Sequence, residues 1–256
     1  MRYSACIEML FTDRPLVARV DAAAAAGCQA VEFWGLEGKD VAGICRRARA
    51  LGLPVAACAV GAPLADPARH EESVQRLAAA IAAASQHGLP NLIVTSGDAV
   101  AGQADEAQEA AIVAALGAVA SRAAAAGVRV HLEALNSLVD HPACFLDRTE
   151  RAARIVAAVG SDCVRLLYDA YHAQIMEGNI IQTLRRIAPL LGYVHVAAVP
   201  GRTEPGDGEL AYGAIMRALA ALGYEGFVGL EFRPSGGAGN SGTAVRAALA
   251  SLCASA

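Results

Sequence analysis

A short apolar run followed by an alanine-rich helical run recurs along the whole chain, and this repeat limits the possible folds more than any other feature. The apolar runs predict eight strands, at Tyr3–Met9, Ala30–Gly35, Pro54–Val60, Asn91–Gly97, Arg129–Leu135, Val164–Ala170, Tyr193–Val199 and Phe227–Arg233. Apolar residues at three- and four-residue spacing predict helices between them. The clearest helices are Pro15–Ala26, Glu71–Gln86, Ala107–Ala126, Arg148–Val159, Ile180–Leu191 and Tyr212–Leu222. Several end at a glycine, which suits the left-handed conformation that closes a helix.

Strands that alternate with helices predict a parallel sheet, and eight is the number at which such a sheet closes into a filled barrel. A doubly wound open sheet is the alternative, but no G-x-G-x-x-G turn follows the first strand. A length of 256 residues suits one barrel, and no linker or change of composition divides the chain. We therefore predict an α/β fold, a single (β/α)₈ TIM barrel over residues 1–256.

Composition and charge narrow the class of partner. With 55% hydrophobic and 18% charged residues, the chain can bury a large core. Its net charge of −4 contains no basic run, whereas nucleic-acid backbones select basic grooves. Lys39 is the one lysine and lies in a stretch that is predicted to be exposed, so Schiff-base chemistry is disfavoured. A small molecule is the expected partner.

The cysteines and the longest uncharged stretch bear on location. None of the seven cysteines forms a C-x-x-C pair, which favours free thiols in a reducing cytoplasm. Glu8 interrupts the apolar start of the chain, so no signal peptide is predicted. Residues 77–97 are long enough to span a bilayer, but the polar segment 85–91 divides them into a helix end and a strand. We expect a cytoplasmic protein without a membrane partner.

Charged side chains interrupt each of the last four predicted strands. These strands read RVHLEAL, VRLLYDA, YVHVAAV and FVGLEFR, and they contain Glu133, Asp169, His195 and Glu231. Parallel strands covered on both faces should be apolar throughout. Because side chains alternate between the two faces of a strand, the acids are expected to point inward. They would meet at the end of the barrel where TIM-barrel active sites lie.

Several inward carboxylates require compensating positive charge, since an unpaired buried carboxylate costs several kcal/mol. A structural ion pair would explain any one of them, and Arg165 or Arg233 could supply it. The convergence of all of them favours one divalent metal ion instead. Three carboxylates and one imidazole suit Mn²⁺, Mg²⁺ or Co²⁺, with Zn²⁺ or Fe²⁺ as alternatives.

Long motifs at these positions resemble the hydroxypyruvate isomerase family of the xylose-isomerase-like barrels. They are SACIEMLF, AAGCQAVEFWG, LEALN, YDAYHAQIMEGN, HVAAVPGRTEPGDGELAY and GYEGFVGLEFRP, and they cover nearly the whole chain. His195 is more similar to the 2-oxo-tetronate isomerase branch, because many hydroxypyruvate isomerases carry Gln there. The loop after the third strand is shorter than in the family and lacks its His or Asn, and the stretch after the second strand is reduced to GLEGKD. The resemblance therefore supports the family's metal chemistry for this chain more strongly than it supports the family's substrate.

The resemblance implies roles for the charged residues. Glu133 and Glu231 would be both metal ligands and the acid/base pair, while Asp169 and His195 would complete the coordination. An enediolate isomerisation needs two such carboxylates with separated pKa values.

Other polar residues receive weaker assignments. The resemblance implies that His172 hydrogen-bonds a substrate oxygen and that Arg202 holds a substrate carboxylate. The alternatives are an ordinary loop histidine and a solvated surface arginine. His131, Glu32 and Glu8 are expected to support the site or the core rather than to bind metal.

We therefore expect an isomerase of a small hydroxy-carbonyl acid, acting on hydroxypyruvate or a four-carbon 2-oxo acid. A ketose 3-epimerase or inosose isomerase acting on a neutral sugar is the main alternative. A nuclease of the AP-endonuclease type and a non-catalytic binding protein are more remote. Family members are often dimers or tetramers, which makes a homo-oligomer an expectation from resemblance alone.

Overall fold

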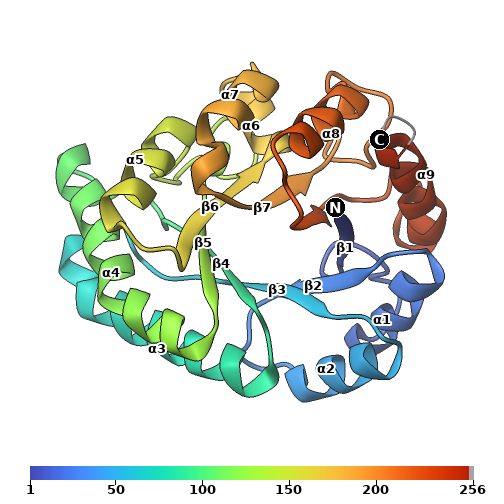
Figure 1. The fold of residues 1–256 in the computed structure, drawn as a ribbon, viewed down its shortest axis with the longest axis horizontal. Helices are drawn as coiled ribbons and strands as arrows, with labels where there is room; N and C mark the ends of the chain where they lie inside the picture. Colours follow the sequence, from blue (N-terminus) through green and yellow to red (C-terminus); the bar gives the residue numbers. More distant parts are fainter. Residues whose placement is uncertain (254–256) are drawn as a thin grey trace.

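The computed structural model describes residues 1–253, and these form a closed barrel of parallel strands (Figure 1). Neighbours in the barrel follow the order β1 to β8, and β8 pairs with β1. The strands are β1 Arg2–Cys6, β2 Ala30–Trp34, β3 Val55–Val60, β4 Asn91–Thr95, β5 Arg129–Glu133, β6 Val164–Asp169, β7 Leu191–Val196 and β8 Phe227–Leu230. The predicted (β/α)₈ barrel is confirmed, and the open-sheet alternative is wrong.

Helices form the outer ring around the strands (Figure 1). They are α1 Leu16–Ala25, α2 Val41–Ala50, α3 His70–His87, α4 Asp105–Ala126, α5 Thr149–Val159, α6 Ala170–Met176, α7 Ile180–Ile187, α8 Tyr212–Ala221 and α9 Ser241–Cys253. Short 3₁₀ turns cover Pro67–Arg69, Ala188–Leu190 and Ala238–Asn240. Left-handed glycines end α3, α4 and α5, as the sequence predicted.

Two apolar segments bear on the question of a membrane. Residues 77–97 divide between α3 and β4, as predicted. By length and composition alone, α4 could cross a membrane. In the barrel, however, α4 packs against α3 and α5 in the outer ring. Its high hydropathy comes largely from alanine, which also suits a barrel helix.

The element boundaries differ from the predictions at both ends of the barrel. The first strand ends at Cys6 rather than Met9, because the chain turns there and the Met9 and Leu10 N–H groups donate to the Cys6 carbonyl oxygen. The predicted helix Ile180–Leu191 ends at Ile187, since the 3₁₀ turn follows and Leu191 pairs with Leu166 as the start of β7. Helix α6 was missed because it begins directly after β6, with no loop between them.

A second, smaller apolar cluster fills the inside of the barrel, apart from the main core between strands and helices. It contains Ile93, Leu167, Tyr193 and Phe227 together with small alanines. These residues alternate along their strands with the outward side chains that pack under the helices. They close the barrel below its carboxyl-terminal mouth, so that the polar side chains at the strand ends stand on an apolar floor.

Candidate active site

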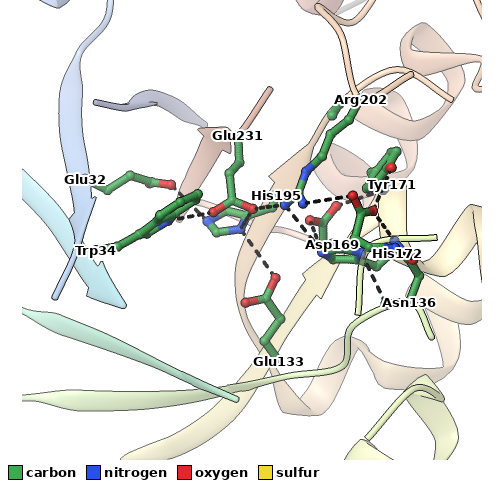
Figure 2. A network of polar contacts seen from close by, with 12 residues as sticks. Glu32, Trp34, Glu133, Asn136, Asp169, Tyr171, His172, His195, Arg202 and Glu231 are labelled. Atoms are coloured by element: carbon green, nitrogen blue, oxygen red, sulfur yellow. Dashed lines mark hydrogen bonds and ion pairs between the residues drawn. The ribbon is translucent and has the colours of Figure 1, made fainter. Parts of the chain in front are cut away.

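The mouth of the barrel gathers carboxylates from three strands (Figure 2). Glu133 ends β5, Asp169 ends β6 and Glu231 follows β8, and each is at most 5% exposed. One ligand atom from each of these three residues and from His172 lies within 4.8 Å of the others. Alternation along the strands thus brings the predicted acids together on the barrel axis.

The predicted ligand His195 is not one of these four residues, and His172 takes its place. Three atoms of the predicted ligands are buried without a hydrogen-bond partner among the described residues. They are Glu133 Oε1, Asp169 Oδ2 and His195 Nδ1. His195 Nδ1 lies 3.6 Å from Glu133 Oε1 and 3.5 Å from Glu231 Oε2. Unpartnered lone pairs facing one another in a buried site are costly unless a cation lies between them. The donor set, which consists of carboxylate oxygens and one imidazole nitrogen, fits a hard divalent cation such as Mn²⁺ or Mg²⁺.

The two histidines at the mouth present different groups to its centre. His172 lies in the first turn of α6, and its Nδ1 accepts a hydrogen bond of 3.2 Å from the backbone N–H of Asn136. A neutral ring then carries its proton on Nε2, which lies 3.5 Å from Asp169 Oδ2. The donor Arg202 Nη2 also lies 3.5 Å from this nitrogen, so in this tautomer two donors face each other at that long distance. His172 therefore offers a donor, which suits a substrate oxygen. Burial lowers the pKa of His195, but the charges of Glu231 and Glu32 outweigh it and raise that pKa well above its ordinary value. Its Nδ1 lies between two glutamates and would offer a lone pair to a metal ion once the ring loses a proton.

The ionisable groups are held at different pKa values. Burial raises the pKa of Glu133 and raises that of Asp169 to about 6. For Glu231 burial acts in the same direction, but the charges of His195 and Arg202 outweigh it and hold its pKa well below the usual range. Burial lowers the pKa of His172 to about 4, so this ring is neutral at neutral pH. Two glutamates with separated pKa values can act as base and acid.

Arg202 is part of the site and not a solvated surface residue. It is 8% exposed, and its Nη2 donates to Glu231 Oε2 at 2.7 Å. Its guanidinium also lies over the Tyr171 ring, 5.0 Å from the centroid, and Nη1 is 3.9 Å from Asp140 Oδ1. The backbone of Arg202 has a left-handed φ of 55°. A non-glycine residue in this conformation costs about 1–3 kcal/mol, which is typical of functional loops.

A cavity of about 440 Å³ opens above the carboxylates. Its polar wall includes Glu133, His172, Arg202 and Glu231. The rest of the lining is mostly apolar or small, and it contains Trp34, Ala59, Thr95, Gly97, Leu135, Pro142, Ala143 and Cys144, together with the polar Asp98 and His141. A concave site with a few convergent polar groups on an apolar background suits a small molecule.

Sequence reasoning missed two residues of this site. The Trp34 indole Nε1 donates to Glu231 Oε1 at 3.0 Å. Asp140 accepts hydrogen bonds from Asn136 Nδ2 at 2.7 Å and from the Tyr171 hydroxyl at 2.8 Å. Trp34 could have been noticed, because it follows Glu32 by two residues on the same inward face at a strand end. Asp140 lies in a turn whose position the sequence does not signal.

Other polar candidates lie outside the carboxylate group. Arg165 is near the opposite end of β6, 4.0 Å from Asp162, and Arg233 is exposed. Neither of these predicted ion-pair partners therefore reaches the acids, and Arg202 pairs with Glu231 instead. His131 is fully buried beneath the site, with Nε2 2.9 Å from Asn91 Oδ1. Glu8 forms an ion pair with Lys39.

Comparison with known proteins places the chain among isomerases of this fold. Residues 20–254 match the family model described as xylose isomerase-like TIM barrel. The 2-oxo-tetronate isomerase of Cupriavidus necator is 32% identical over 246 residues, which are 92% of this chain and 94% of that protein. The hydroxypyruvate isomerase of Escherichia coli (strain K12) is 31% identical over 243 residues, which are 91% and 94% of the two chains.

A solved structure extends the likeness to three dimensions. The crystal structure of AP endonuclease, family 2, from Brucella melitensis superposes with a TM-score of 0.87 at 27% identity. The match covers 94% of this chain and 96% of that chain.

Proposed function

The chain belongs to the xylose isomerase-like TIM-barrel family, and from this premise we propose that it is a metal-dependent isomerase of a small hydroxy-carbonyl acid. Hydroxypyruvate and 2-oxo-tetronate are the proposed substrates. One observation carries the proposal most strongly. Unpartnered atoms of Glu133, Asp169 and His195 converge beside Glu231, directly below a cavity of about 440 Å³.

In this proposal Glu133, Asp169, His195 and Glu231 hold the metal ion. A bound divalent ion supplies positive charge where negative charge develops on the enediolate oxygens. The chain contributes the geometry of the donors. Its buried site also keeps water away, which strengthens every electrostatic interaction there.

Two glutamates would move the proton between neighbouring carbons of the substrate. Glu231 has a lowered pKa and is ionised, so it is suited to remove the first proton. Glu133 has a pKa raised by burial, so it is suited to return a proton to the adjacent carbon. The substrate hydroxyl proton would move to the former carbonyl oxygen, and the proton taken up by Glu231 would pass back to Glu133 before the next turnover. His172, with its proton on Nε2, would donate a hydrogen bond to a substrate oxygen.

Arg202 is the proposed contact for the substrate carboxylate. It lines the cavity, and its Nη1 is only loosely engaged by Asp140, at 3.9 Å. Nη2 donates to Glu231, the proposed base, while Nη1 would be available to the substrate carboxylate. One guanidinium could therefore contact the base and the substrate at the same time. The same proposal places the enzyme in the cytoplasm, where its free cysteines would remain reduced.

An isomerase screen tests this function. Purified protein is incubated with hydroxypyruvate, 2-oxo-tetronate or free ketoses, with added Mn²⁺ and after removal of metal by a chelator. We expect turnover of an acid substrate that chelation abolishes and Mn²⁺ restores. Turnover of free ketoses alone would favour a 3-epimerase or inosose isomerase. Cleavage of an abasic duplex without isomerase activity would favour a nuclease, the class named for the Brucella structure.

A further inference from the structure

A buried polar chain runs beneath the metal-binding group and ends on His195. The Tyr193 hydroxyl donates to Glu32 Oε2 at 2.6 Å, and Glu32 Oε1 lies 2.9 Å from His195 Nε2. This second contact is a close approach of charge without hydrogen-bond alignment, since neither of its two atoms has a hydrogen-bond partner among the described residues. All three side chains are at most 2% exposed. Figure 2 shows Glu32 and Glu133 on different sides of the His195 ring. Each ring nitrogen of His195 thus faces a different carboxylate: Nε2 faces Glu32, and Nδ1 faces Glu133.

The barrel leaves space for this pair at a glycine in β8. A Cβ atom at Gly229 would lie 2.5 Å from His195 Cδ2 and 2.6 Å from Glu32 Oε1. Glycine inside a strand weakens the strand, and it commonly marks a site where other groups approach the backbone closely. The closeness of Glu32 and His195 explains why the otherwise apolar strand FVGL carries a glycine.

Resting on the proposed function, we propose that Glu32, oriented by Tyr193, is a positioning residue that keeps the His195 proton on Nε2 and aims the Nδ1 lone pair at the metal. A neutral imidazole carries one proton, and a carboxylate beside one nitrogen fixes it there. Neither Glu32 nor Tyr193 contacts substrate in this arrangement. Both would act through His195 alone.

Glu32→Gln tests this assignment, because Tyr193 controls how the new amide would lie. Its hydroxyl would donate to the amide oxygen, which turns the NH₂ group towards His195 Nε2. That nitrogen would then have to accept, and the ring proton would move to Nδ1, where the metal is expected. We expect Mn²⁺ to bind about 10- to 100-fold more weakly, a loss typical of substitutions behind a metal ligand.

The double variant Glu32→Gln/Tyr193→Phe separates this role from simple loss of packing. Without the hydroxyl the amide is free to turn and to present its oxygen to His195 Nε2. We expect the double variant to bind Mn²⁺ more tightly than Glu32→Gln alone. A merely structural role predicts equal or weaker binding, because two buried contacts would be lost rather than one. Glu8→Gln, in the neighbouring carboxylate paired with Lys39, is the matched control and should bind Mn²⁺ normally.

Mn²⁺ affinity is measured on chelator-stripped protein by calorimetry and by electron paramagnetic resonance, without substrate. If wild-type protein fails to bind Mn²⁺, the proposed function itself fails. If the wild type binds and Glu32→Gln binds equally well, the positioning role alone is overturned. A double variant that binds no better than Glu32→Gln would also overturn it. If Glu32→Gln does not fold, nitrogen NMR of the Mg²⁺-loaded wild type decides, because a His195 proton on Nδ1 would contradict the proposal.

Discussion

The two halves of the barrel contribute differently to its mouth. In the second half, strands β5 to β7 and the residue after β8 each place an ionisable side chain on the axis. In the first half, the cavity is lined by Trp34, Ala59, Thr95 and Gly97, with Asp98 as the one ionisable residue among the described lining residues of that half. The difference separates two tasks, because the second half carries charge and the first half provides space and an apolar surface.

Glu32 is the exception that couples the halves. It lies on β2 in the first half, but its carboxylate contacts His195 and the Tyr193 hydroxyl, both on β7. Trp34, also on β2, connects the two halves in a similar way, because its indole Nε1 donates to Glu231 Oε1. We therefore expect substitutions in the second half to reduce the rate of the chemical step strongly. Substitutions in the first half should change how well the substrate fits.

The largest effect should come from removing charge in the second half. Glu231→Gln keeps the size of the side chain and an oxygen for the Trp34 indole, but it removes the proposed base. We expect kcat to fall by about 100- to 10,000-fold, the usual contribution of an acid or base. The rate is measured with hydroxypyruvate at saturating Mn²⁺, beside the exposed control Glu106→Gln. An unchanged rate would remove Glu231 from the chemistry.

Lowering the pH should weaken metal binding, because it protonates proposed ligands in the second half of the barrel. Metal ligands must be deprotonated, and burial raises the pKa of Asp169 to about 6 in the metal-free chain. Loss of the Asp169 proton should therefore strengthen Mn²⁺ binding by about tenfold per pH unit up to that value. The affinity should continue to rise above it, because the pKa of His195 is raised well above its ordinary value and this ring must also lose a proton. Titrations of Mn²⁺ binding between pH 5 and about 8 check this expectation. A flat profile would show that Asp169 does not bind the ion.

The same shift predicts how metal-free stability changes with pH. The folded pKa of Asp169 lies above its ordinary value of 3.8, so the protonated folded form is favoured. This contribution is fully present below about pH 4 and is lost as pH rises through about 6. Added Mn²⁺ should therefore raise the melting temperature more at pH 7 than at pH 5.

Filling the cavity from the first half should have a smaller and different effect. Ala59→Leu adds volume to the cavity lining at a position outside the carboxylate group. We expect KM to rise by about tenfold while Mn²⁺ affinity stays the same, since pockets discriminate at about 1–3 kcal/mol per methylene. Ala101→Leu, at an exposed position, serves as the control. A loss of Mn²⁺ binding in Ala59→Leu would contradict the proposed separation of tasks.

The smallest effect is expected at the edge of the second half. Asp140→Asn keeps an oxygen for the Tyr171 hydroxyl but removes the charge that faces Arg202 at 3.9 Å. Because a long contact to a partly exposed carboxylate is worth about 1 kcal/mol or less, KM should change only a few-fold. Steady-state kinetics measure the change, and a loss as large as that of Glu231→Gln would show that Asp140 is needed for the chemistry.

Much of the site was predictable because strand alternation is a local property. The patterns RVHLE and FVGLE already place Glu133 and Glu231 on the inward face, and the structure has both there. The surroundings of His172 were not predictable, since the sequence does not show that α6 follows β6 without a loop. The arginine that pairs with the acids was also not predicted correctly. The sequence suggested Arg165 or Arg233, which lie within predicted strands, whereas Arg202 comes from a loop.

The sequence by itself determined the repeat of strand and helix, the closure into a barrel and the face on which each strand residue lies. These follow from backbone periodicity, which needs only neighbouring residues. The tertiary structure decided which side chains touch across the mouth, as with Trp34 and Glu231, which are 197 residues apart in the chain. Such contacts depend on the register of every strand around the closed ring and on the conformation of the loops above it, and no short segment encodes either.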